Sequence, residues 1–294
     1  MSQYKITFIT PLFSRGAYED SPEIRPSSIR GQLHWWFRAL DGTYADEKAI
    51  FGGVQKGTVA SKVVIRVSSI EGDKGSVNTL PHKSGGPAAP KMAYCTETSF
   101  HLHVLTRLGG LEGTLKTGFE RSLKAWLLLG TLGLRSTRAA GSFIWEPLDG
   151  GFAYPQTFDE YERECQTLLS GSPTLKFALL NKEYSSSEEA RRDVSDTLGG
   201  QNPQNGGNEL NALNYPLGNV HIGREIPGVP KRKTSPLRFR IVKCGDIYRI
   251  AAVWDNRREV TTNTERDLQG IIRLLNDRKP HLGSQLINSS LYQN

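Results

Sequence analysis

The chain has 294 residues, of which 37% are hydrophobic and 9% aromatic, so it can build one large domain or two ordinary ones. Its formal charge of +7 permits an acidic partner such as nucleic acid but does not demand one. The 3 cysteines are odd in number and far apart, which excludes a disulfide framework and a zinc-ligand spacing and predicts reduced thiols in a cytoplasmic protein. We expect neither a secretory leader nor a membrane span, because no signal-peptide profile and no long apolar run is present.

The first predicted strand surrounds Tyr4, where apolar and polar residues alternate. A loop rich in Pro, Gly, Ser and Asp leads to residues 25–40, which predict a helix with Ser27 as its cap. The apolar residues that recur there at helical spacing are Ile29, Leu33, Trp36 and Leu40. One side of this helix therefore faces the core.

Another face of the same helix carries hydrogen-bond donors at steps of four residues. These donors, which we call the ladder, are Arg30, His34 and Arg38. The helix start at Arg25, Ser27 and Ser28 adds free amides and a positive dipole, which suit a phosphate. The alternative is a core helix whose basic face is merely solvated.

The remainder of the first half predicts a split βαβ order. Phe51 is expected in the core, with the following glycines in a tight turn or a close backbone approach. The predicted elements are strands at 62–69, 98–107 and 143–146 and a helix at 116–132, whereas 71–92 is expected to lack regular structure. This order predicts a ferredoxin-like unit with both helices on one face of an antiparallel sheet. His101 and His103 share a strand face, but no third ligand has a recognisable spacing, so we predict no metal site.

The second half predicts a further, degenerate ferredoxin-like unit. Its predicted elements are helices at 158–169, 187–198 and 264–276 and strands at 175–180, 237–241 and 248–254, the last two forming a hairpin. Residues 201–208 predict a low-complexity loop. The fold class is therefore α+β, with tandem ferredoxin-like (RRM-like) domains at 1–150 and 151–294 and long glycine-rich loops.

Two further segments carry positive charge. The glycine-rich loop from Gly133 to Ser142 combines glycines, hydroxyls and arginines that suit a phosphate, although most such loops are connectors. Its candidate RNA contacts are Arg135, Ser136, Arg138 and Gly141. A basic cluster adds Lys231, Arg232 and Lys233, which a solvated loop would also explain. Bases could stack on the five tryptophans, which are Trp35, Trp36, Trp126, Trp145 and Trp254. Tryptophans at helical spacing are, however, more often core residues.

Catalytic motifs are absent from the sequence. It has no Walker loop, no Rossmann fingerprint, no HExxH, no GxSxG and no paired carboxylates in one motif. His34 is the one plausible catalytic side chain in a basic setting, as a general acid or base on an RNA 2′-hydroxyl. The simpler interpretation makes His34 one more rung of the ladder.

Several of these stretches resemble one known family. The matching segments are Thr10–Phe13, Glu23–Gly31, Leu33 with Trp35–Leu40, and Ile50–Gly52. They closely resemble the start of the first-numbered subunit of the Cmr complex, the type III-B CRISPR effector, whose family belongs to the RAMP superfamily. The loop at 133–142 looks like the glycine-rich loop of that superfamily, and 233–239 resembles a segment of the family's C-terminal half. The resemblance is thin from 150 to 230, and histidine stands near position 34, where the family commonly has a basic residue.

The resemblance implies tandem ferredoxin-like domains with no cofactor and no catalytic metal. It implies a non-catalytic RNA-binding subunit of an antiviral ribonucleoprotein, whose partners are crRNA, target RNA and other Cmr subunits. Such a subunit would hold the 3′ part of the crRNA and the guide–target duplex, while another, repeated subunit cleaves the target. Two alternatives stay open: a metal-independent endoribonuclease that uses His34, and a mainly structural protein–protein subunit.

Overall fold

The computed structural model describes residues 2–16, 18, 21–54, 57–81, 90–107, 109–199 and 237–255, together with five residues between 269 and 276. Across these residues, no helix has both the length and the apolar character needed to cross a membrane. The predicted loop at 201–208 and the cluster Lys231–Lys233 lie outside the described residues, as does most of the predicted helix at 264–276.

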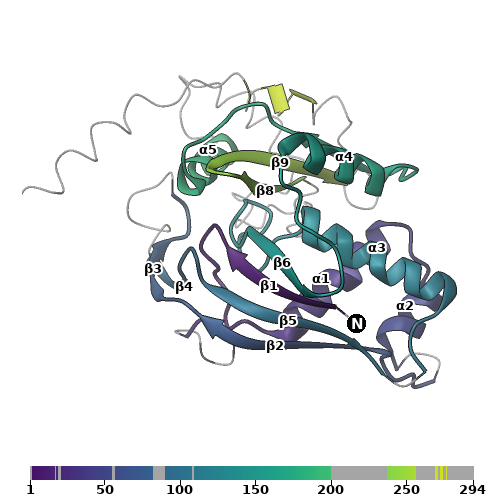
Figure 1. Cartoon of the computed structure of the whole chain (residues 1–294). Coiled ribbons are helices and arrows are strands. Elements are labelled where there is room, and N and C mark those ends of the chain that lie inside the picture. The colour runs from purple at the N-terminus through teal and green to yellow at the C-terminus, as the bar shows by residue number, and fades with distance from the viewer. Residues whose placement is uncertain are drawn as a thin grey trace, which may run out of the picture.

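The first half forms a four-stranded antiparallel sheet in the order β2-β5-β1-β6 (Figure 1). Its strands are β1 (Ser2–Phe8), β2 (Val63–Glu71), β5 (Ser99–Thr106) and β6 (Phe143–Asp149). Helices α1 (Pro26–Ala39) and α3 (Gly113–Leu129) pack against each other and cover one face. With two crossover helices and this strand order, the predicted split βαβ unit is confirmed.

Alternation along β1 decides which face of the sheet is covered. Tyr4, Ile6 and Phe8 are fully buried under the helices, whereas the residues between them are half-exposed. Trp36 of α1 and Trp126 of α3 are fully buried in the same core. The opposite face of the sheet therefore carries the polar half of the pattern.

A helix and a hairpin of the first half were not predicted. Helix α2 (Tyr44–Phe51) follows α1, and the Thr43 side chain caps it by accepting from the Asp46 amide at 3.1 Å. The segment expected to be irregular contains the hairpin of β3 (Lys74–Asn78) and β4 (Pro90–Tyr94). The glycine prediction is confirmed, because Gly52 has φ +77° and a Cβ there would lie 2.7 Å from backbone atoms.

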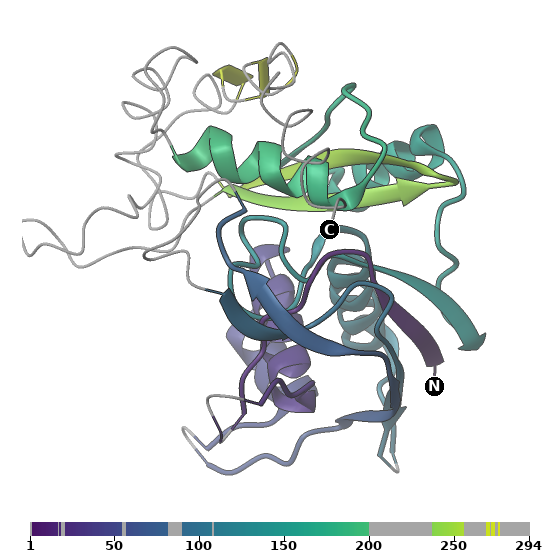
Figure 2. The ribbon, with the colours of Figure 1, turned by 90° about the vertical axis from the view of Figure 1, so that its left-hand side faces the viewer.

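The second half contains a three-stranded antiparallel sheet in the order β7-β9-β8. Its elements are α4 (Phe158–Leu169), β7 (Leu175–Leu179), α5 (Ser187–Gly199), β8 (Leu237–Cys244) and β9 (Ile247–Asp255). Counting from β7, this is the 1-3-2 strand order of a ferredoxin-like unit, and α4 additionally packs on α3. The sheet lies over one end of the first unit (Figures 1 and 2). The predicted division at residue 150 stays a prediction.

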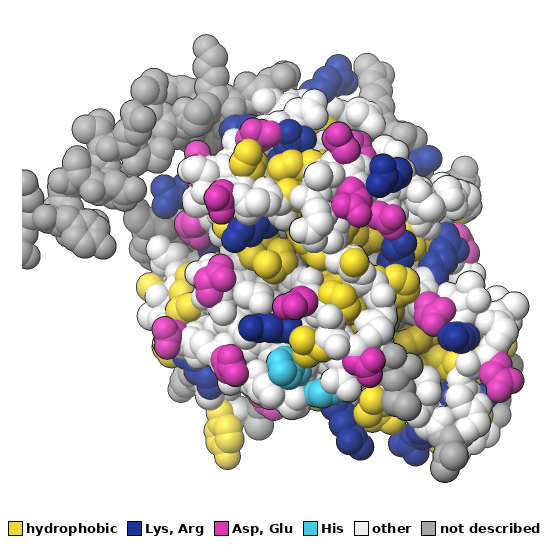
Figure 3. Space-filling model, viewed as in Figure 1, with side chains coloured by type: hydrophobic (Ala, Val, Ile, Leu, Met, Phe, Trp, Pro, Cys, Tyr) yellow, Lys and Arg dark blue, Asp and Glu magenta, His cyan; other side chains and the backbone are white. Residues whose placement is uncertain are grey.

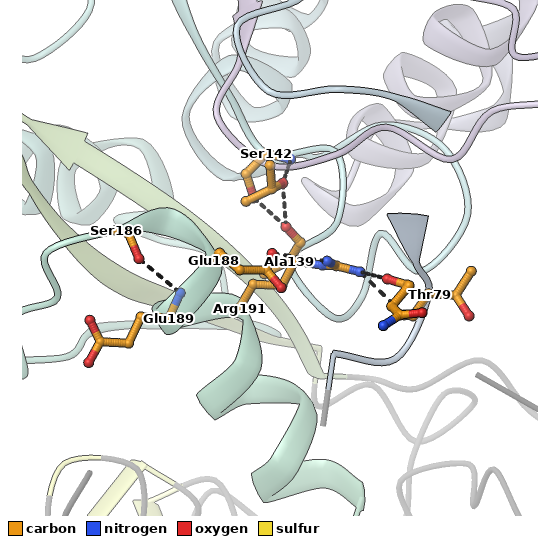
Figure 4. A network of polar contacts seen from close by, with 9 residues as sticks. Thr79, Ala139, Ser142, Ser186, Glu188, Glu189 and Arg191 are labelled. Carbon is orange, nitrogen blue, oxygen red and sulfur yellow. Dashed lines mark hydrogen bonds and ion pairs between the residues drawn. The ribbon is translucent and has the colours of Figure 1, made fainter. Parts of the chain in front are cut away.

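Buried arginines of the second unit reach into the first. The Arg240 side chain of β8 donates to the carbonyls of Leu127, Gly130 and Phe143 and is 2% exposed. Arg191 of α5 donates to the carbonyls of Asn78, at 2.9 Å, and Thr79, at 3.3 Å (Figure 4). These donors bind backbone carbonyls of the first unit, so they fix the two units to each other.

Candidate nucleic-acid interface

The start of α1 differs in detail from the prediction. The N-cap is Arg25, in an extended conformation, and no side chain caps the helix, so the prediction that Ser27 is the cap is wrong. The reason is Pro26, whose fixed φ suits the first helical position and whose ring keeps the preceding residue extended. Arg25 and Ser27 are exposed and Ser28 is half-buried, so this helix start presents polar groups to solvent.

The ladder is bound largely by the neighbouring helix α2. Arg30 donates to the carbonyl of Phe51, and the His34 ring stacks on the Phe51 ring with centroids 4.1 Å apart. His34 Nδ1 lies 2.6 Å from Glu47 Oε1, and Arg38 Nη1 lies 3.3 Å from the same oxygen. Two of the three rungs are therefore held inside the protein.

Arg38 is the rung that reaches solvent. Its side chain is 55% exposed, compared with 24% for His34 and 8% for Glu47. A groove of about 570 Å³ opens beside it, with Lys48 also in its wall. This groove holds cations around one carboxylate, so Glu47 offsets part of the charge that an anion would meet.

The glycine-rich loop, Gly133–Ser142, is paired with the segment that leads into α1. The Leu134 amide donates to the Phe13 carbonyl at 2.6 Å, and the Gly141 amide donates to the Pro11 carbonyl at 3.0 Å. Gly141 has φ +66° and is buried, so its role is to let the backbone turn. Its N–H is used inside the protein and does not face a ligand.

The same loop also contacts the second unit. The Phe239 amide of β8 donates to the Thr137 carbonyl at 3.2 Å, and the buried Ser142 hydroxyl accepts from the Ile241 amide at 3.0 Å. Arg135 has φ +59°, an unusual conformation for a residue with a side chain, and such strain often marks functional loops. Arg135, Ser136 and Arg138 are half-buried, at the junction between the two units.

The tryptophans lie mostly in the core. Trp36, Trp126 and Trp254 are fully buried, and Trp145 donates to the Phe152 carbonyl at 2.8 Å. Trp35 carries the guanidinium of Arg238 from β8, 3.7 Å from the ring centroid. Burial lowers the pKa of Arg238 to about 10, and Asp255 opposes this shift. The ring of Trp35 is thus used to join the two units, which favours the core interpretation.

The structure brings the predicted site residues together in two places. The ladder lies on the α2 side of α1, and the glycine-rich loop lies against residues 11–13 and β8. Sequence reasoning missed Glu47, which joins His34 to Arg38. Its signal was present, because Thr43 and Asp46 have the spacing of a capping box and so predict a short helix. Within the described ranges, no group of three or more His, Cys, Asp or Glu side chains could hold a metal ion.

Comparison with known proteins finds a family match over the first unit. A model of the RAMP superfamily matches residues 5–144. This match covers just under half of the chain. The match to the RAMP superfamily begins within β1 and includes α1 and the whole glycine-rich loop.

The curated relatives are Cmr subunits of Pyrococcus furiosus. The Cmr subunit Cmr1-2 is 36% identical over 83 residues, which cover 25% of this chain and 43% of the relative. The Cmr subunit Cmr1-1 is 28% identical over 138 residues, which cover 41% of this chain and 40% of the relative. The matched part therefore spans about two fifths of each curated relative.

The fold comparison extends over both units. The crystal structure of apo Cmr1 from Pyrococcus furiosus matches with a TM-score of 0.59 at 17% identity, over 92% of this chain and 95% of that one. A chain of the cryo-EM structure of the type III-B Cmr-beta bound to cognate target RNA matches with a TM-score of 0.62 at 10% identity, over 93% and 98%. At these identities the likeness shows a shared fold, which includes the second unit.

Proposed function

We propose that this chain is a non-catalytic RNA-binding subunit of a type III-B CRISPR (Cmr) RNA-guided effector complex. In antiviral defence it would hold the 3′ part of the crRNA and the guide–target RNA duplex, with other Cmr subunits as neighbours. One observation carries the proposal: the fold of apo Cmr1 from Pyrococcus furiosus matches over 92% of this chain.

The geometry divides the predicted contacts into two kinds. Arg38, Arg135 and Arg138 would contact phosphates, together with the helix start at Arg25 and Ser27. Arg30 would act on RNA indirectly, because its guanidinium fixes α1 to α2 through the Phe51 carbonyl. Lys231–Lys233 stay predicted contacts outside the described residues.

Salt dependence tests the phosphate contacts. Each phosphate contact to single-stranded RNA steepens the plot of log K against log salt by about 0.7. We expect the Arg38→Ala, Arg135→Ala and Arg138→Ala variants to weaken binding to unrelated RNA sequences equally and to flatten that slope by about 0.7 each. Arg163→Ala is the control, since Arg163 is an exposed arginine on α4. Slopes unchanged in all three variants would contradict the assignment.

His34 is the residue on which the alternative function, RNA cleavage, depends. Its Nδ1 is bound to Glu47 and its ring lies flat on Phe51, so the side chain is already oriented by the protein. We expect labelled RNA to stay full length during long incubation with the chain in EDTA, under conditions where a native gel shows binding. Fragments with 2′,3′-cyclic phosphate ends that disappear in His34→Ala would make the chain an endoribonuclease instead.

The assembled complex tests the third possibility, a mainly structural subunit. On our proposal, ultraviolet crosslinking of the complex attaches crRNA to peptides from 133–142 or from the start of α1. Crosslinks from these peptides to protein alone would favour a structural role.

A further inference from the structure

The face of the first sheet that points away from α1 and α3 has a distinct composition. On β5, Phe100, Leu102 and Val104 are buried under the helices, so His101 and His103 lie on the opposite face and are partly exposed. Register places Lys5 of β1 beside His101 and Arg66 of β2 beside His103. We call these four residues the histidine face.

The two imidazole rings of the histidine face meet edge to face. Their centroids are 6.5 Å apart and their planes 73° apart, and Ser68 Oγ lies 2.7 Å from His103 Nε2. Figure 3 looks onto this side of the molecule, where histidine side chains reach the surface over β5 and β2. The other end of the face is covered, because Ile144 of β6 packs into the core of the second unit.

Both signs of charge occur on this face. The central strands β1 and β5 contain no Asp or Glu and carry Lys5, while Arg66 lies on the edge strand β2. Carboxylates lie at the margins: Glu146 opposite Lys5 on the edge strand β6, and Glu71 at the end of β2. Lys5 and Arg66 thus offer phosphates two cations beside the histidines, and the carboxylates repel a polyanion at the margins.

The fold defines what this arrangement can bind. In a ferredoxin-like sheet of this order, flat side chains on the central strands present rings on which unstacked bases can lie, and histidine is among the side chains that do so. Neighbouring strands are about 4.8 Å apart, so Lys5 and Arg66 stand where the phosphates flanking a stacked base would pass. Neither the ladder nor the glycine-rich loop takes part in this surface.

We infer that the histidine face is a second RNA site, which binds about two unpaired nucleotides of single-stranded RNA by stacking their bases on His101 and His103. Lys5 and Arg66 bind the adjacent phosphates. The inference rests on the proposed function, in that the chain binds RNA, but it assigns a separate surface with a different mode of contact.

The test is the affinity of the full chain for a labelled oligouridine, measured by fluorescence anisotropy. Replacing both rings, in His101→Ala/His103→Ala, should weaken binding by about tenfold or more, because stacking contributes severalfold per base. The variant His101→Phe/His103→Phe keeps flat rings and should bind within about twofold of wild type. Lys5→Ala should flatten the salt slope by about 0.7, whereas the control Lys116→Ala on α3 should not.

The outcomes separate this inference from the proposed function. Equal affinities of the double alanine variant and wild type, with weakened binding in Arg135→Ala/Arg138→Ala, would overturn the histidine face and leave the proposed function standing. A phenylalanine variant as weak as the alanine variant, although folded by circular dichroism, would overturn the stacking mode. Wild-type chain that binds no RNA would overturn both.

Discussion

Arg240 provides the sharpest test of how the two units are joined. Its guanidinium donates to three carbonyls of the first unit and lies 4.6 Å from the Phe143 ring centroid and 5.7 Å from that of Trp145. Two of the carbonyls, at Leu127 and Gly130, belong to the end of α3, where backbone acceptors lack intrahelical donors. The side chain thus acts as a C-terminal cap supplied by another unit.

We expect Arg240→Met to lower the free energy of unfolding by about 4 kcal/mol. Each hydrogen bond from a charged donor contributes roughly 1.5–3 kcal/mol, and the three share one side chain, so their effects do not simply add. Methionine keeps most of the volume, which separates the lost hydrogen bonds from a cavity effect. Arg240→Lys should recover only part of the loss, because an ammonium on one stem cannot span carbonyls that a planar fork reaches.

Urea unfolding followed by tryptophan fluorescence measures the effect. Trp126 and Trp254, one in each unit, are both fully buried and report on both cores. The control is Arg163→Met on α4, an exposed position where we expect less than about 0.5 kcal/mol. An Arg240→Met chain as stable as wild type would refute the reasoning, since it would show that the buried charge costs as much in desolvation as its hydrogen bonds return.

Three further predictions follow from single positions. Glu47→Gln removes the carboxylate that binds His34 and Arg38, so RNA affinity should rise severalfold. The same change should lower the free energy of unfolding by about 1–2 kcal/mol, and both quantities are measured on one preparation. Gly141→Ala should lower the free energy of unfolding by at least about 3 kcal/mol, because the new Cβ would lie 1.9 Å from the Leu132 carbonyl oxygen. The control is Gly171→Ala, where φ is also positive but the space is open, and it should cost about 1 kcal/mol in the same urea assay. Burial raises the pKa of the Cys165 thiol to about 12, so a thiol reagent at pH 8 should label it only after unfolding. The thiol ionises at about pH 8.5 in the unfolded chain but only at about 12 in the folded protein. Its contribution to the free energy of unfolding is therefore fully present below about pH 8.5 and is lost as the pH rises from there towards 12.

Local patterns predicted most of the elements, because their cause is local. The alternation in β1 and the helical spacing in α1 each record burial on one side, and both elements lie where expected. Helix α2 and the β3–β4 hairpin were missed for a shared reason. Both are short, so they carry little apolar periodicity, and neighbours hold them in place.

The predicted site was harder to foresee, since it depends on partners distant in sequence. The donors of the ladder were visible in the sequence, but their contacts with α2, which involve all three, were not. In β8, the arginines of Leu237-Arg238-Phe239-Arg240 look like polar residues of an edge strand. Arg238 instead lies on Trp35, and Arg240 is buried in the first unit. Only the packing of the second unit on the first decides which face of β8 meets solvent.

This packing changes what the formal charge of +7 means for RNA binding. Arg191 and Arg240 are buried, and Arg30 is bound to a carbonyl, so these cations stabilise the fold and do not meet a polyanion. The contacts of Arg38, Arg135 and Arg138 alone would make log K fall with log salt by a slope of about 2, and the contacts of Lys5 and Arg66 on the histidine face would raise that slope to about 3.5. A slope near 2 that Lys5→Ala leaves unchanged would count against phosphate contacts on the histidine face. A slope of 4 or more would require still further cations, with the cluster Lys231–Lys233 as a source.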